Sequence, residues 1–144
     1  MTGMPDNVSL KELILSSKQA ANADIEAIKS HCPLTKKFFE EKLTDYVLHK
    51  YLLTREDYER AGGVFNDLTE LSLAKSMKIS KELVREFDLA KSCDGVSSAM
   101  AKKVLLFRSI EKAFDIQLPA KQTAKFKYLS ELSDMTWEAL RSRD

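Results

Sequence analysis

The sequence predicts an all-α protein in which an N-terminal helical hairpin precedes a helical bundle. Apolar residues recur every three or four positions in several stretches, and this spacing places them on one face of a helix. Glycine and proline number only four and three in 144 residues, so few tight turns are expected. Strand-like alternation of polar and apolar residues is weak along the chain. The pattern divides the chain into a flexible start at residues 1–8, a hairpin at 9–53 and a bundle at 54–144.

The hairpin opens with a capping signal. Ser9 and Glu12 have the spacing of a capping box, in which both side chains accept hydrogen bonds from free backbone amides. An apolar stripe, interrupted at Ser17, runs along this first helix and consists of Leu10, Ile14, Ala21, Ile25 and Ile28. Pro33 is expected to end the helix and Thr35 to cap the next one. The buried face of that second helix is predicted to be Phe39, Leu43, Tyr46, Val47 and Tyr51. The short connection favours antiparallel packing.

A third helix start is predicted at Thr54, where acidic residues follow in the first turn. The apolar face of this helix is predicted to be Tyr58, Ala61, Phe65, Leu68 and Ser72. Gly62 and Gly63 fall inside this pattern and cost a helix roughly 1 kcal/mol each against alanine. Either the helix breaks at the two glycines or another backbone packs closely against them. The surviving periodicity favours the close packing of another backbone.

Residues 104–119 are the most informative stretch of the chain. One helical face is predicted to contain Val104, Phe107, Ile110 and Phe114. Residues 115–118 then alternate polar and apolar side chains, and Pro119 ends them, because a residue before proline avoids helical geometry. A short helical turn is expected up to about residue 125. The last helix is predicted over about residues 128–141, with an inward face of Leu129, Leu132, Thr136 and Leu140.

Charge and composition narrow the classes of partner. Lysine and arginine number 23 against 22 aspartates and glutamates, so neither nucleic acid nor a membrane surface is an expected partner. No apolar run approaches the ~20 residues of a membrane span, and the first residues lack the features of a secretion signal. A cytoplasmic location is therefore expected. Cys32 and Cys93 are expected to be buried free thiols, with a disulfide as the less favoured alternative.

The sequence carries no pattern typical of a catalytic or metal site. It has neither a glycine-rich phosphate loop nor a nucleophile motif. His31 and Cys32 are adjacent, but no second pair follows at metal-ligand spacing. We therefore predict no catalytic residue and no metal ligand, and we do not expect an enzyme.

From about residue 58 onward the chain resembles an acyl carrier protein. Residues 110–119, Ile-Glu-Lys-Ala-Phe-Asp-Ile-Gln-Leu-Pro, are similar to the end of that family's second helix. Residues 77–84 resemble the loop after its first helix, 87–89 the anchor of that loop, and 129–140 its fourth helix. The resemblance implies an acyl-carrier-like four-helix bundle after the hairpin, and it does not explain the hairpin itself.

The resemblance also implies where a prosthetic group would be attached. Carriers of this family hold 4′-phosphopantetheine on the serine of an Asp-Ser-Leu motif at the start of the second helix, where the helix dipole favours a phosphate. An ungapped comparison from Phe114 places Met100 at the serine position. Ser98 takes that position only if two residues are added, and Ser97 and Ala99 then replace the aspartate and the leucine. Ser98 is therefore the candidate attachment residue, and a helix cap is its alternative role.

The charge of this helix departs from the family pattern. The family's second helix is usually acidic and docks on basic enzyme surfaces, whereas this one carries Lys102, Lys103, Arg108 and Lys112 against Glu111. Basic surfaces would repel it, so different partners are expected. Lys102, Lys103 and Arg108 are the candidate partner-binding residues, and a solvated helix face is the alternative.

These patterns leave three hypotheses of function. The leading one is a non-catalytic acyl-carrier-like module that needs no cofactor and acts through protein–protein contacts, with biosynthetic enzymes among the partners that the resemblance implies. The second is a divergent active acyl or peptidyl carrier that is phosphopantetheinylated at Ser98. The third is a helical bundle that binds a small molecule or lipid between its helices.

Overall fold

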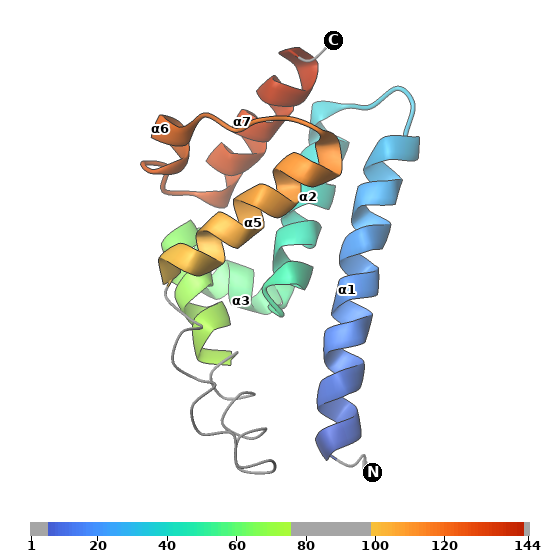
Figure 1. Ribbon diagram of the computed structural model, residues 1–144, viewed down its shortest axis with the longest axis vertical. Coiled ribbons are helices and arrows are strands. Elements are labelled where there is room, and N and C mark those ends of the chain that lie inside the picture. Colours follow the sequence, from blue (N-terminus) through green and yellow to red (C-terminus); the bar gives the residue numbers. More distant parts are fainter. Residues whose placement is uncertain (1–5, 76–98, 143–144) are drawn as a thin grey trace.

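The computed structural model describes residues 6–75 and 99–142 (Figure 1). Within these residues the regular elements are helices, and one isolated bridge pairs Val64 with Tyr128. The helices are α1 (Asp6–Ser30), α2 (Lys36–Lys50), α3 (Arg55–Arg60), a segment over 65–75, α5 (Ala99–Phe114), α6 (Ala120–Thr123) and α7 (Leu129–Ser142). The all-α prediction is confirmed. The predicted loop segments at 77–84 and 87–89, together with Cys93 and Ser98, lie outside the described residues.

The predicted hairpin is formed by α1 and α2, which lie side by side and run in opposite directions (Figure 1). α1 ends at Ser30, just before Pro33, and the Thr35 Oγ1 accepts the Phe38 N–H at 3.2 Å at the start of α2. Both predicted boundaries are confirmed. The start predicted at Ser9 is wrong, because α1 begins at Asp6.

The first half of α1 extends beyond the rest of the bundle. Ala21, Ile25 and Ile28 are buried as predicted, but Ile14 is 43% exposed. α1 has 25 residues and α2 only 15, and at about 1.5 Å per residue the longer helix must project past the shorter one. Of the predicted apolar stripe, the three residues in the C-terminal half of α1 are therefore buried and Ile14 is exposed.

The hairpin and the later helices share one core. All five residues predicted for the inner face of α2 are buried. The Phe39 ring centre lies 5.8 Å from that of Phe114 and 5.4 Å from that of Trp137, so α2 packs on both α5 and α7. Tyr46 of α2 also forms a hydrogen bond with Ser109 of α5. Aromatic contacts at these distances add to the burial of apolar area.

Both alternatives for the two glycines occur, because the helix breaks there and another backbone also packs closely, as the favoured prediction has it. α3 ends at Arg60, and Gly62 and Gly63 have φ angles of 64° and 73°, a conformation that residues with a Cβ adopt at a cost. The glycines end α3 in a Schellman motif, because the Gly63 N–H donates to the Tyr58 carbonyl at 3.2 Å. Another backbone does pack here, since the Leu129 N–H donates to the Gly63 carbonyl at 2.9 Å.

A lysine links the end of the hairpin to the helices that follow it. Thr54 and Asp57 form a capping box at the start of α3, as the predicted cap at Thr54 requires. Lys75 Nζ lies 2.9 Å from Asp57 Oδ2 and donates to the Leu52 carbonyl at 3.1 Å. This contact ties the hairpin, α3 and the 65–75 segment together.

The buried face of α5 differs from the predicted one at its N-terminal end. Ile110 and Phe114 are buried and Phe107 is half-buried as expected, but Val104 is 39% exposed and Leu106 is buried in its place. After α5 the predicted alternation is confirmed, because Ile116 and Leu118 are buried and their neighbours are exposed. Glu111 holds this exit, since its carboxylate accepts the Leu118 N–H at 2.8 Å.

α6 and α7 occupy the predicted positions. Leu129, Leu132 and Thr136 are buried, while Leu140 is half-buried. The described helices include none that is both long enough and apolar enough to cross a membrane.

Candidate functional site

An exposed apolar ridge marks the start of α5. Met100 is 66% exposed, Leu105 is 67% exposed and Val104 is 39% exposed, and all three belong to the N-terminal half of α5. Met100 is the second residue of α5, and the first turn of this helix has no acidic residue. Large apolar side chains that are exposed singly are ordinary, but a cluster of them is typical of a contact surface.

A groove of about 360 Å³ lies between the end of the hairpin and α5, and Leu105 is the exposed apolar residue of α5 that lines it. Its lining residues are Lys50, Tyr51, Lys102, Leu105 and Leu106. Tyr51 and Leu106 are buried and form an apolar floor. The Tyr51 hydroxyl forms a hydrogen bond of 3.1 Å with Thr69 Oγ1, and this bond fixes the ring. We call these five lining residues the α5 groove.

Lys102 projects across the α5 groove. Its Nζ lies 5.4 Å from the centre of the Tyr51 ring, which is the range of a cation–π contact. Burial lowers the pKa of Lys102. Burial also raises the pKa of Tyr51 to about 12, against the opposing effect of its hydrogen bond with Thr69. The lysine therefore faces a neutral ring.

The other basic residues near the start of α5 are also without acidic partners. Lys103 Nζ lies 6.0 Å from the Phe65 ring centre, and Lys50 Nζ lies 5.9 Å from the Tyr46 ring centre. Among the residues that the structure describes, none of Lys50, Lys102 and Lys103 forms an ion pair. The surface around the α5 groove is consequently both apolar and positively charged.

The predicted partner-binding residues are not equivalent in the structure. Lys102 lines the α5 groove, Lys103 lies next to it in the chain and turns toward Phe65, and Arg108 is exposed further along α5 and does not line the groove. The sequence did not reveal Lys50, which comes from the end of α2 and joins the site only through the packing of the hairpin. Ser98, the candidate attachment residue, lies outside the described residues.

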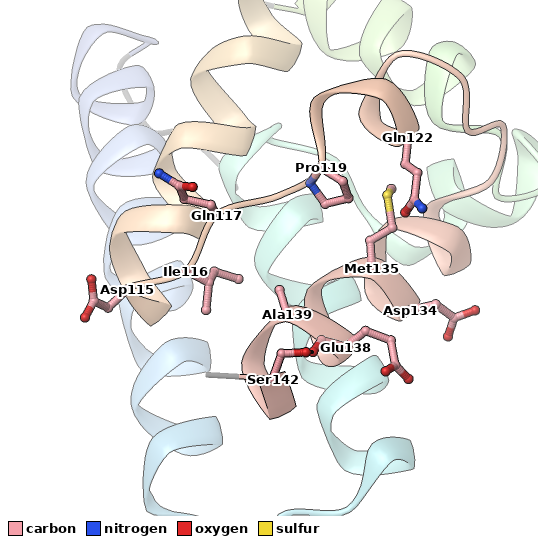
Figure 2. Close-up of a pocket in the computed structure, with 10 residues that line it drawn as sticks. All are labelled: Asp115, Ile116, Gln117, Pro119, Gln122, Asp134, Met135, Glu138, Ala139 and Ser142. Atoms are coloured by element: carbon pink, nitrogen blue, oxygen red, sulfur yellow. Dashed lines mark hydrogen bonds between the residues drawn. The ribbon is translucent and has the colours of Figure 1, made fainter. Parts of the chain in front are cut away.

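A larger pocket of about 880 Å³ lies between the exit of α5 and α7 (Figure 2). Asp115 and Asp134 stand on opposite sides of this pocket, so their carboxylates do not converge (Figure 2). Asp134 is also paired with Lys36 at 3.1 Å. The described part of the chain contains no group of three His, Cys, Asp or Glu residues that is suited to a metal ion.

Cys32 differs from its prediction, because this free thiol is exposed. It lies in the short connection between α1 and α2, and such connections run along the surface. Its neighbour His31 stacks on Phe38 with ring centres 3.9 Å apart.

Comparison of the chain with protein-family models, with curated proteins and with solved structures gave no match. Its function is therefore inferred from its own residues and geometry.

Proposed function

We propose that this protein is a non-catalytic, acyl-carrier-like helical module that acts by contacting other proteins. The observation that carries the proposal is the position of Met100. This residue stands exposed in the first turn of α5, where the resemblance assigns the serine of a carrier. A thioether has no hydroxyl group that a transferase can modify, and methionine is common on surfaces that bind other proteins.

The order of the helices supports the acyl-carrier-like part of the proposal. After the hairpin come α3, the 65–75 segment, residues 76–98, α5, the short α6 and α7. The resemblance implies a single long first helix where the chain has α3 and the 65–75 segment, and it implies the order of α5, α6 and α7. The similarity of residues 110–119 to the end of the family's second helix also supports the proposal.

The surface at the start of α5 supports the protein-contact part. Exposed apolar side chains of α5 occur together with lysines that form no ion pair with any residue the structure describes, and apolar and charged groups are commonly combined in protein interfaces. We propose that the module works in the cytoplasm and without a prosthetic group.

A divergent carrier modified at Ser98 is the second candidate. The observation in its favour is that α5 begins at Ala99, the next residue in the chain, so a group on Ser98 would adjoin a helix N-terminus.

Intact mass separates the two candidates. The full chain is co-expressed with a phosphopantetheinyl transferase of broad specificity, beside a known acyl carrier protein as positive control. We expect the unmodified mass for this chain and a mass gain for the control. A gain of one phosphopantetheine that disappears in Ser98→Ala would overturn the proposal.

A further inference from the structure

We propose that the α5 groove binds an acidic amphipathic helix of a partner protein, with one apolar side chain of that helix seated between Lys50 and Lys102. This inference rests on the proposed function as a protein-contact module, and it adds the chemistry of the partner.

The shape of the α5 groove favours an apolar side chain of the partner as its main contact. Its floor is formed by the buried Tyr51 and Leu106, and Leu105 stands at its edge with most of its surface exposed. A volume of about 360 Å³ accommodates a single large side chain such as leucine or phenylalanine. Anchors of this kind, held in a pocket and shielded from water, supply most of the affinity of many interfaces.

The positive charge of the lysines around the α5 groove favours acidic residues beside that apolar side chain in the partner. Lys102 is already half-buried, and its lowered pKa shows that part of its hydration is lost. A carboxylate that approaches this ammonium group therefore acts in a less polar medium than bulk water, where the attraction between opposite charges is stronger. Lys50 lies on the other side of the groove, so carboxylates on both sides of one anchor would each meet a lysine.

The geometry favours a helix over an extended peptide. The α5 groove lies between α2 and α5, and an amphipathic helix binds such a groove by laying its apolar face into it. An extended peptide usually binds by adding a strand to a sheet edge. Residues 6–75 and 99–142 contain no strand that could offer such an edge.

A protein partner is favoured over an anionic membrane. Segments that recognise anionic lipids usually carry clusters of about four to eight basic residues. Here three lysines surround the site, and each holds its ammonium group over an aromatic ring of its own chain. The formal net charge of the whole chain is only +1.

Two synthetic helical peptides of about four turns test the proposal against the full-length protein. Both carry leucines at one-turn intervals, and these are flanked by glutamates in the first peptide and by lysines in the second. Binding is measured by fluorescence anisotropy, and sedimentation with vesicles that contain phosphatidylserine is measured in parallel. The variants are Lys102→Glu and Lys50→Glu, and Lys121→Glu on α6 is the matched control because it makes the same charge change on another element. Lys50 is exposed, so its variant remains informative if Lys102→Glu fails to fold.

We expect the acidic peptide to bind and the basic peptide to bind at least about 10-fold more weakly. Lys102→Glu and Lys50→Glu should each weaken the acidic peptide by about 10-fold, and Lys121→Glu by less than about 2-fold. Equal binding of the two peptides, or equal effects of Lys102→Glu and Lys121→Glu, would overturn the proposal. Binding to the vesicles without binding to the acidic peptide would overturn it in favour of a membrane surface.

The intact mass of the same protein sample, after co-expression with the transferase, separates this proposal from the proposed function. A phosphopantetheine gain refutes the proposed function whatever the peptides do. An unmodified mass without binding of the acidic peptide refutes only the acidic partner.

Discussion

The ammonium group of Lys102 lies 5.4 Å from the centre of the Tyr51 ring and so joins the start of α5 to the end of the hairpin. Lys50 and Tyr51 enter the α5 groove from the end of α2, and Lys102, Leu105 and Leu106 enter it from α5. A four-helix bundle without the hairpin would lack the first two of these residues. The hairpin, which the resemblance to acyl carrier proteins does not explain, therefore helps to build the surface that we propose as a contact site.

The capping box at α3 makes stability depend on pH. The Thr54 backbone N–H, together with the ammonium group of Lys75, lowers the pKa of Asp57 from 3.8 to about 2. The folded protein therefore binds this proton less tightly than the unfolded chain does. The resulting stability is fully present above pH 3.8 and is lost as the pH falls toward about 2.

Asp57→Asn should reduce the free energy of unfolding at neutral pH by about 2 kcal/mol and flatten its dependence on acid. Urea unfolding at several pH values measures both effects. Asp67→Asn is the control, because this exposed carboxylate takes part in no ion pair of the described residues. Equal acid dependence of the wild type and Asp57→Asn would contradict this account of the cap.

The two glycines after α3 give a second prediction. Gly62→Ala should lower the free energy of unfolding by about 1–2 kcal/mol, because its φ of 64° strains alanine although no atom lies within 4 Å of the added Cβ. Gly63→Ala should cost about as much, because its φ of 73° is also left-handed and the Tyr58 hydroxyl, 3.4 Å from the added Cβ, is at ordinary contact distance. Thermal melts monitored by circular dichroism measure both losses.

Gly62→Asn serves as the control for backbone strain, because asparagine tolerates a positive φ better than alanine does. It should retain more stability than Gly62→Ala. If asparagine costs as much as alanine, or if Gly62→Ala is as stable as the wild type, the left-handed turn is not required at this position.

α7 contains a buried hydroxyl without a partner. Ser133 Oγ is the buried side-chain polar atom of the described residues that makes no hydrogen bond, whereas Thr136 Oγ1 donates to the Leu132 carbonyl at 2.8 Å. Ser133→Ala should therefore raise the free energy of unfolding by about 1 kcal/mol, because it removes an unpaired buried group and favours the helix. Thr136→Val should give no such gain. Chemical denaturation of both variants would refute this account if Ser133→Ala destabilised the protein as much as Thr136→Val.

Local signals predicted the boundaries of the fold well. Pro33, Thr35 and Thr54 act on the residues beside them, so their effects can be read without knowledge of the tertiary structure. The inner face of α2 was also predictable, because a single set of apolar residues fits one helical face.

Predictions that depend on distant contacts were less successful. Val104 and Leu106 both continue an apolar helical period toward Ile110, and only the positions of the neighbouring helices decide that Leu106 is buried. Gly63 ends α3 and also meets the backbone of Leu129, which is far away in sequence. The site also depends on distant contacts. Lys50 and Lys102 line the same groove only because α2 packs against α5.

The most direct test of the central claim restores the motif that the chain lacks. We propose that Met100 occupies the serine position of a carrier-like scaffold. The triple variant Ala99→Asp, Met100→Ser, Ala101→Leu should therefore become a substrate of a phosphopantetheinyl transferase. The measurement is intact mass after co-expression with a phosphopantetheinyl transferase, with the wild type treated identically. We predict a gain of one phosphopantetheine in the triple variant and no gain in the wild type. A modified wild type, or an unmodified triple variant that is folded by circular dichroism, would contradict the account.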